Sequence, residues 1–226
     1  MTLTEFQQTL HALYQGDVEY PTTSDDEWEH RLVLLKTAIS TWDNEKGMLW
    51  SELWKQHEDG DGDEVVVANT LSYDCPTDFR FPGGFVKTTS SGGQITYWKV
   101  IQPHRAEIQT SGNYCYFTGN KAEGHILTFL AQPTTGDAID FPYYKEPAVI
   151  SVGADILEMS DPYFAIYFSL SKLHEISGEG DRSIKALQEA QARLSAMKTR
   201  NIMPAWYQEN AVPDRDWVLG ASGFGN

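Results

Sequence analysis

The chain has 226 residues, enough for one large domain or for one domain that carries a sizeable insertion. Its 17 Lys and Arg residues are outnumbered by 32 Asp and Glu residues, which gives a formal net charge of −15. This balance argues against ordinary nucleic-acid binding, in which cationic side chains neutralise phosphates. It is compatible with an acidic conduit along which DNA slides without sticking.

Two further features indicate the compartment. The first residues, Met1 to Phe6, lack the basic and apolar regions of a signal peptide, and no apolar run is long enough to span a bilayer. Cys75 and Cys115 both lie in strand-like context, which fits buried thiols in a reducing compartment better than a disulfide framework. We therefore expect a protein that is made in the cytoplasm and does not enter a membrane.

Two helices are predicted near the N-terminus. Thr2-x-x-Glu5 and Ser24-x-x-Glu27 are capping boxes, and the two helices are predicted to end at Gly16 and Gly47. The second helix carries an apolar stripe at steps of three and four residues: Trp28, Leu32, Leu35, Ile39 and Trp42. We expect this stripe to be core. A short apolar patch follows, formed by Leu49, Trp50, Leu53 and Trp54.

The stretch His57–Asn69, HEDGDGDEVVVAN, places Asp at alternate positions, a spacing that suits calcium. Counted from Asp59, however, the sixth residue is Glu64 rather than Gly, and the twelfth is Thr70 rather than Glu. The valines that follow Glu64 predict a strand instead of a helix. We interpret the stretch as a solvated acidic turn that joins two domains, without a metal site.

From Val65 to about Ile150 the pattern changes to short β-branched or aromatic runs separated by Gly, Pro and Ser. The predicted strands are Val65–Leu71, Gly84–Thr88, Gln94–Ile101, Ala106–Ile108, Tyr114–Thr118 and Ile126–Ala131. Strands at this spacing favour an antiparallel barrel or sandwich. The stretch Phe141–Pro147 is interpreted as a strand end that folds back with its tyrosines half buried. A surface that stacks a sugar or a base is the alternative.

Helices are predicted again after residue 160. Asp161 and Pro162 form an N-cap with proline at the first helical position, and an apolar face continues to Ile176. Asp181 begins a last helix, whose predicted seam is Ile184, Leu187, Leu194 and Met197. The predicted fold class is therefore α+β. Residues 1–58 and 155–203 form a helical bundle, and residues 64–150 form an inserted antiparallel β barrel or sandwich.

The last residues, 204–226, have no periodic pattern but contain four large aromatic side chains: Trp206, Tyr207, Trp217 and Phe224. Such a segment cannot bury them on itself, so it packs along its own bundle or docks on another subunit. We predict an extended docking arm, because aromatic anchors concentrate binding energy at interfaces. These four residues, with Tyr143 and Tyr144, are the candidate interface residues.

The sequence contains no arrangement typical of a catalyst. The six histidines lack paired spacing for zinc, and neither a nucleophile elbow nor a phosphate-binding glycine loop is present. Carboxylates are so abundant that no particular glycosidase pair is indicated. We expect no enzymatic activity, no cofactor and no required metal.

The order of elements resembles that of tailed-phage head-to-tail adaptor (connector) proteins, of the tail tubular protein A and podophage adaptor types. The stretches that carry this resemblance are Ala38-Ile39…Trp42, Trp50-Ser-Glu-Leu53, and Tyr144-Lys-Glu-Pro147…Asp155…Met159-Ser-Asp-Pro162-Tyr163. The resemblance is one of order and spacing over most of the chain. The long insert with aromatic strands and the extended acidic tail depart from the family pattern.

This resemblance implies a virion structural protein in the neck. Its copies form a ring of about twelve below the portal protein and above downstream neck or tail proteins. Genomic DNA passes through the lumen without sequence-specific binding. The alternatives are another neck or tail component, such as a stopper, tail-tube or baseplate protein, or a sugar-binding β module. The sugar-binding alternative predicts a monomer with affinity for glycans.

Overall fold

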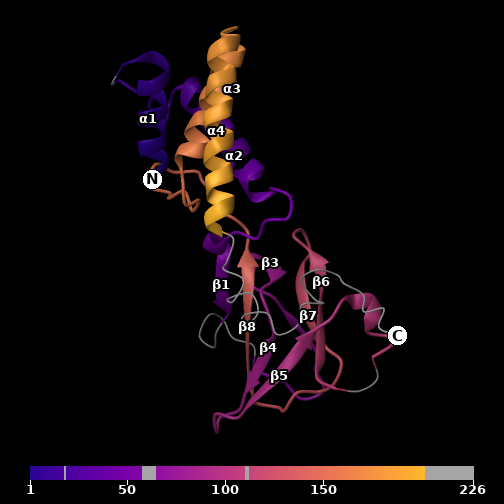
Figure 1. Cartoon of the computed structure of the whole chain (residues 1–226). Helices are drawn as coiled ribbons and strands as arrows, with labels where there is room; N and C mark the ends of the chain where they lie inside the picture. The colour runs from indigo at the N-terminus through magenta and orange to yellow at the C-terminus, as the bar shows by residue number, and fades with distance from the viewer. Residues whose placement is uncertain (18, 58–64, 110–111, 202–226) are drawn as a thin grey trace, which may run out of the picture. The chain divides into compact units, whose positions relative to one another are not determined.

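The computed structural model describes residues 1–17, 19–57, 65–109 and 112–201 (Figure 1). The chain divides into two compact units. Among the described residues, the helical unit contains 1–52 and 147–201, and the sheet unit contains Leu53–Glu146. The described part of the sheet unit is therefore one continuous insertion between the two chain segments of the helical unit.

The described residues of the helical unit form four α-helices: α1 (Leu3–Gln15), α2 (Asp26–Asp43), α3 (Tyr163–Ile176) and α4 (Gly180–Asn201). Helix α1 begins with the predicted capping box, in which Thr2 accepts from the amide of Glu5 while the Glu5 carboxylate accepts from the amide of Thr2. It ends at Gly16, whose φ of 74° is left-handed and favours glycine.

The predicted helical bundle is not what the structure shows. Helix α3 is central, since α1, α2 and α4 all pack mainly against it. Helix α4 buries Ala186, Ala190 and Met197, whereas Ile184 and Leu187 of the predicted seam are 57% and 37% exposed. The predicted seam was thus wrong for Ile184 and Leu187 and right for Met197, because the first half of α4 packs through the small side chains of Ala186 and Ala190, which permit close approach.

The stripe on α2 was predicted correctly for four of its five members. Trp28, Leu32, Leu35 and Trp42 are buried, while Ile39 is half-buried. Of the apolar face predicted between Pro162 and Ile176, Ile166 and Leu170 are buried, but Tyr163 is 43% exposed. The apolar period of 3.6 therefore identified the core face of α2.

The first residues of the chain are bound to the segment that precedes α3. The amide of Leu3 donates to the carbonyl of Asp155 at 2.9 Å, and the amide of Thr4 donates to the carbonyl of Gly153 at 3.0 Å. The amide of Leu157 donates to the carbonyl of Met1 at 3.0 Å. These bonds join the two chain segments of the helical unit.

In the described part of the sheet unit, eight strands form one curled sheet (Figure 1). They are β1 (Trp54–His57), β2 (Ser72–Asp74), β3 (Phe79–Pro82), β4 (Val86–Thr89), β5 (Ile95–Val100), β6 (Tyr114–Asn120), β7 (Gly124–Phe129) and β8 (Ala138–Lys145). Their order is β1-β8-β4-β5-β6-β7-β2, and β3 pairs with β8. Strands β5 and β6 run parallel, whereas the other pairs are antiparallel.

An antiparallel barrel or sandwich was therefore the wrong prediction for this unit. The parallel pair requires a connection that crosses over, and the alternation of side chains does not reveal the direction of a strand. Ala106–Ile108 is not a strand but follows a 3₁₀ helix, Pro103–Arg105. The predicted strand Val65–Leu71 is also absent, because only Val65 pairs, in an isolated bridge. Strands β1, β2 and β3 were not predicted, and β8 was predicted only as a strand end.

The acidic turn is not the junction between the units. His57 ends β1, and Val65 forms an isolated bridge with Ala138, so both flanks of the turn belong to the sheet unit. The chain passes from one unit to the other between Glu52 and Leu53. The turn itself, residues 58–64, lies outside the described residues.

The core of the sheet unit is strongly aromatic. Strand β8 turns Ile139, Phe141 and Tyr143 inward, each no more than 2% exposed. The ring of Phe79 stacks on Tyr143 with a centroid distance of 5.6 Å, and on Phe117 at 4.9 Å. Aromatic rings thus fill the concave side of the sheet, which leaves the opposite side free for other residues.

Candidate functional site

The predicted interface residues have different positions. Trp206, Tyr207, Trp217 and Phe224 lie outside the described residues. Tyr143 is fully buried, and its hydroxyl donates to Oδ1 of Asp78 at 2.8 Å, so Tyr143 belongs to the core of the sheet unit rather than to its surface. Tyr144 is half-buried on the opposite side of β8.

Tyr144 is the middle of an aromatic row that crosses three strands. It is paired in register with Trp54 of β1 on one side and with Phe81 of β3 on the other. Directly opposed residues share a face of the sheet, and neighbours along a strand alternate, so this row lies on the face opposite to Tyr143. Trp54 is 49% exposed and Phe81 is 46% exposed. We call Trp54, Tyr144 and Phe81 the aromatic row.

One charged side chain contacts the aromatic row: the guanidinium of Arg80 lies 5.2 Å from the centroid of the Phe81 ring. The ion pair of Lys55 with Asp78 lies instead against Tyr143, on the other face. Burial raises the pKa of Tyr144, so its hydroxyl remains protonated and able to donate a hydrogen bond near neutral pH. This arrangement suits binding by stacking and burial of apolar area, not proton transfer.

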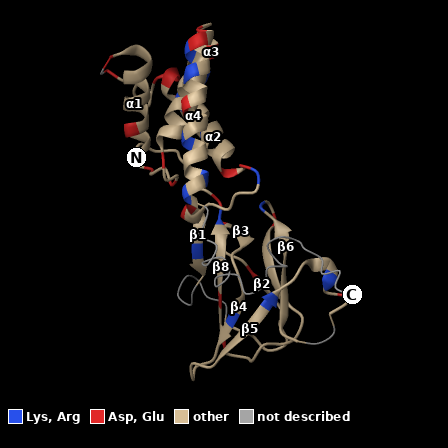
Figure 2. Ribbon diagram, viewed as in Figure 1, with Lys and Arg blue, Asp and Glu red and all other residues tan. Residues whose placement is uncertain are grey.

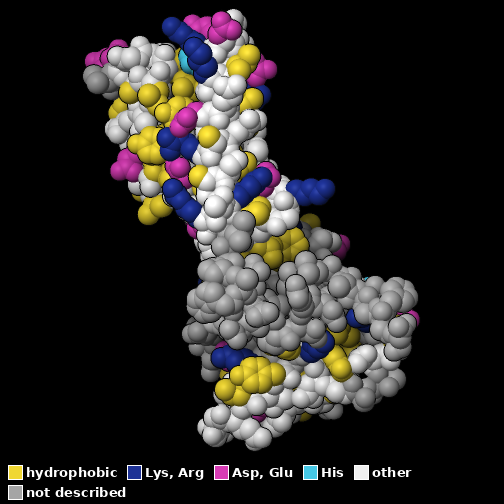
Figure 3. Space-filling view, in the orientation of Figure 1, with side chains coloured by type: hydrophobic (Ala, Val, Ile, Leu, Met, Phe, Trp, Pro, Cys, Tyr) yellow, Lys and Arg dark blue, Asp and Glu magenta, His cyan; other side chains and the backbone are white. Residues whose placement is uncertain are grey.

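Figure 3 shows hydrophobic side chains at the surface of both units. In the helical unit, three large aliphatic side chains on helices are more than half exposed: Val33 on α2, Ile176 on α3 and Ile184 on α4. Monomeric proteins normally expose such residues singly, whereas grouped exposure marks interaction surfaces. Apolar surface is therefore present on the helices as well as on the sheet.

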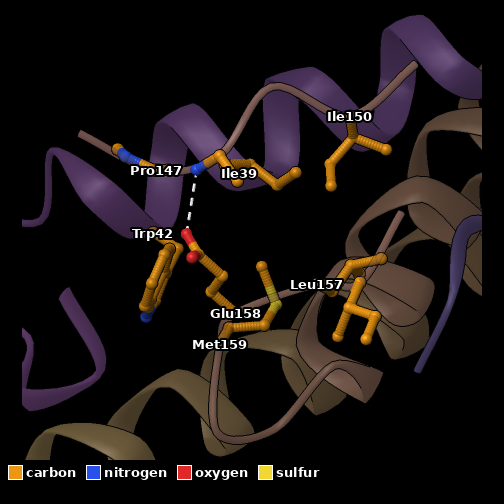
Figure 4. A pocket seen from close by; sticks show the side chains of 9 residues that line it. Ile39, Trp42, Pro147, Ile150, Leu157, Glu158 and Met159 are labelled. Atoms are coloured by element: carbon orange, nitrogen blue, oxygen red, sulfur yellow. Dashed lines mark hydrogen bonds between the residues drawn. The ribbon is translucent and has the colours of Figure 1, made fainter. Parts of the chain in front are cut away.

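A hollow in the helical unit is too small for an organic ligand. Apolar side chains from α2 and from the segment before α3, among them Ile39, Trp42 and Met159, line it (Figure 4). Oε2 of Glu158 accepts from the amide of Ala148 at 2.8 Å at its edge. The volume of about 10 Å³ holds roughly one water molecule.

A buried polar cluster joins α1 and α2. The side chain of Arg31 is fully buried, forms an ion pair with Glu27 and lies with Nη2 3.0 Å from Nδ1 of His11. Because a guanidinium only donates, Nδ1 of His11 is the acceptor, which places the proton of neutral His11 on Nε2. Gln7 belongs to the same cluster, since its Nε2 donates to the carbonyl of Trp28 at 3.2 Å.

Several atoms of this cluster have no hydrogen-bond partner within the described part of the chain: Oε1 of Gln7, Nε2 of His11, and Nε and Nη1 of Arg31. Burying such groups without partners is costly. No histidine spacing or motif in the sequence distinguished these residues, and the cluster has no reactive group aimed at a cavity. The cluster therefore affects the stability of the helical unit and has no part in catalysis.

The described residues contain no group of three His, Cys, Asp or Glu side chains that could hold a metal ion. Burial raises the pKa of the Cys115 thiol far above its usual range, so this cysteine is not an activated nucleophile. None of the helices that the structure describes is long and apolar enough to cross a membrane.

Neither a scan of protein-family models nor a search of curated proteins found a match to this chain.

The aromatic row is the best-defined candidate site on the sheet. Sequence reasoning named Tyr144 but missed Trp54 and Phe81. The alternation Phe79-Arg80-Phe81 would have misplaced Phe81. Residues two apart along a strand normally share a face, but a register shift in β3 turns Phe79 inward and Phe81 outward.

Proposed function

We propose that this chain is a non-enzymatic structural protein of a phage virion, a head-to-tail adaptor. Its copies form a ring below the portal, with a channel for DNA passage. The observation that carries the proposal is the exposed aromatic row, which offers a subunit surface for burial against a neighbouring copy. The order of the elements, which resembles that of the adaptor family, indicates the place in the virion.

The charge of the chain supports the same function. DNA in a channel must move without adhering, and a net charge of −15 disfavours contacts with phosphates. Partners in this function are further copies of the chain, the portal protein and downstream neck or tail proteins. The C-terminal segment, residues 204–226, is proposed as an arm that docks on a neighbouring copy or on the portal.

The experiment that tests this function measures self-association by mass photometry and electron microscopy of the full chain. We expect closed rings at protein concentrations up to the order of 100 µM. Replacing Trp54 and Phe81 by Ser should reduce ring formation, whereas Ile108→Ser, which alters a 77% exposed residue away from the row, should not. A chain that stays monomeric throughout this range would contradict the proposal.

A sugar-binding β module is the second candidate, because the aromatic row also resembles a platform on which a sugar ring stacks. Titration calorimetry of the purified chain against soluble oligosaccharides separates the two candidates. Saturable glycan binding by a monomer, lost in Trp54→Ser, would favour this second function over the adaptor.

A further inference from the structure

We propose that the C-terminal segment of each copy binds the aromatic row of the neighbouring copy, with Trp217 and Phe224 as its anchors. The aromatic row supplies the receiving surface on the sheet unit. Residues 202–226, which lie outside the described residues, supply the segment that covers it. This inference rests on the proposed function, since it names the contact by which copies of the adaptor associate.

The aromatic row is one continuous apolar strip rather than three separate side chains. Trp54 and Phe81 are each nearly half exposed, and Tyr144 lies between them in register on β8. Neighbouring strands lie about 4.8 Å apart, so one partner can cover the adjacent rings of the row together. Grouped exposure of this kind marks an interaction surface.

The C-terminal segment begins beside the chain that leads into this row. Asn201, the last residue of α4, is held by two hydrogen bonds: its Nδ2 donates to the carbonyl of Leu49 at 2.8 Å, and its Oδ1 accepts from the amide of Ser51 at 2.8 Å. Trp54 follows Ser51 by three residues, which span at most about 11 Å. The segment after Asn201 therefore leaves the helical unit close to the point where the chain enters β1.

The length of the segment allows it to reach beyond its own copy. Trp217 and Phe224 follow Asn201 by 16 and 23 residues. An extended chain spans about 3.3 Å per residue, so these two side chains can lie up to about 50 Å and 75 Å from Asn201. A small domain is only about 30 Å across. The two distal aromatic residues can therefore reach the row of a neighbouring copy.

Aromatic side chains on the segment suit an aromatic receiving surface. Each large ring buries about 150–250 Å² when it is covered, and paired rings gain further from offset or edge-to-face contact. Tryptophan is among the residues that most often dominate the energy of an interface. Pro213, Gly220 and Gly223 disfavour a helix around the two anchors, so the segment can lie extended across the three strands of the row.

The contact depends on apolar area rather than on charge. Figure 2 shows the strands of the sheet largely without acidic or basic residues. Arg80, whose guanidinium lies over Phe81, is 4.0 Å from a carboxylate oxygen of Glu146, so its charge is compensated. The binding energy must therefore come from the burial of the rings on both sides.

The segment and the row are different surfaces, so the contact between them is heterologous. Each copy gives its segment to one neighbour and receives a segment from the other. Such a contact propagates from copy to copy and closes into a ring when the rotation allows it.

Two full-length variants test the contact, with self-association measured by sedimentation velocity at concentrations up to the order of 100 µM. The row variant carries Trp54→Ser and Phe81→Ser, and the anchor variant carries Trp217→Ser and Phe224→Ser. Each should associate at least about tenfold more weakly than the natural chain, because the side chains that dominate the interface are lost.

The matched controls are Ile108→Ser in the sheet unit and Gln208→Ser in the segment, and both should associate as the natural chain does. Unchanged circular dichroism and melting temperature show that each variant is folded. Phe81→Ser alone serves as the row variant if the double change unfolds the sheet unit.

A mixture of the two variants separates exchange between copies from docking within one copy. The row variant keeps its segment and the anchor variant keeps its row, so a mixed pair has one intact contact. The mixture should therefore form one-to-one dimers and nothing larger, although each variant alone stays monomeric.

If the natural chain associates and the anchor variant associates equally well, the contact is wrong while the adaptor function stands. Loss of association in both variants without dimers in the mixture also overturns the exchange of segments between copies. A natural chain that remains monomeric contradicts the proposed function itself, and the contact with it.

Discussion

Tyr143 and Asp78, which are 65 residues apart in the chain, are joined by a 2.8 Å hydrogen bond from the tyrosine hydroxyl to Oδ1 of the carboxylate. The adjacent Tyr144 belongs to the aromatic row on the other face. Tyr143→Phe should therefore lower the free energy of unfolding by about 1–2 kcal/mol, because a hydrogen bond to a charged group is lost. Tyr144→Phe is the matched control and should change stability little. Urea denaturation of both variants measures the difference, and equal losses would contradict the assignment of Tyr143 to the core.

Replacing Leu35 by Ala should destabilise the helical unit by about 2–5 kcal/mol, because the side chain is fully buried and its removal leaves a cavity. Leu187→Ala makes the same chemical change on a partly exposed side chain and should cost much less. Thermal or urea denaturation of the two variants provides the comparison. A cost below about 0.5 kcal/mol for Leu35→Ala would show that the residue is not core.

The buried Arg31 gives a prediction in which the removal of a charge is tolerated. Arg31→Met keeps much of the side-chain volume and removes two buried nitrogens that have no hydrogen-bond partner among the described residues, while Glu27, whose side chain is 42% exposed, is left to be hydrated. By contrast, His11→Phe removes the acceptor of Arg31 and should cost about 1–3 kcal/mol. Urea denaturation measures the loss in the free energy of unfolding for each variant. A larger loss for Arg31→Met than for His11→Phe would contradict the inferred role of His11.

Asp155 gives a prediction about pH. Its pKa is lowered, first by the amide of Val152, then by the amide and hydroxyl of Ser151. Because the pKa is lower in the folded state than in the unfolded state, the Asp155 carboxylate stabilises the turn at pH values above its ordinary pKa. This stabilisation is lost as the pH falls through the pKa of the folded state. Titration followed by carbon-13 NMR should give a value below 3.8, and Asp155→Asn should remove this titration.

Deleting residues 205–226 tests the proposed arm. We expect the truncated chain to associate less with its own copies or with the portal, while its melting temperature stays near that of the full chain. The reason is that aromatic anchors at an interface contribute to association rather than to the fold of the subunit. Full association combined with an earlier melting transition would instead show that the segment packs on its own subunit.

The sequence predicts those features that depend on residues close together in the chain, and it fails for those that depend on tertiary packing. The stripe on α2 and the capping box of α1 were predictable, because both arise from residues within a few turns of each other. The buried face of α4 was not, since the burial of Ala186 and Ala190 depends on how closely α3 approaches. A prediction based on the spacing of large apolar residues selects Ile184 as a buried residue of α4 instead.

The sheet shows the same difference between local features, which could be predicted, and long-range features, which could not. Most of its hairpins follow from short strands with Gly-rich turns, but the parallel pairing of β5 with β6 depends on a crossover that no local signal specifies. Strand β8 was predicted only as a strand end, Phe141–Pro147, because Pro142 interrupts its apolar run and proline is unusual within a sheet. The aromatic row could not be predicted for a related reason, since it brings together three strands that are distant in sequence.

The continuous insertion of the sheet unit has a consequence for biosynthesis. Leu53–Glu146 contains the eight strands of the described residues, so this part of the chain can fold as soon as the ribosome releases it. The helical unit must wait, because α1 and α2 need α3, and the amide of Leu3 needs the carbonyl of Asp155. Domains generally fold as units during synthesis. The nascent chain therefore exposes the apolar stripe of α2 until α3 is made, and this interval is when chaperones are most needed.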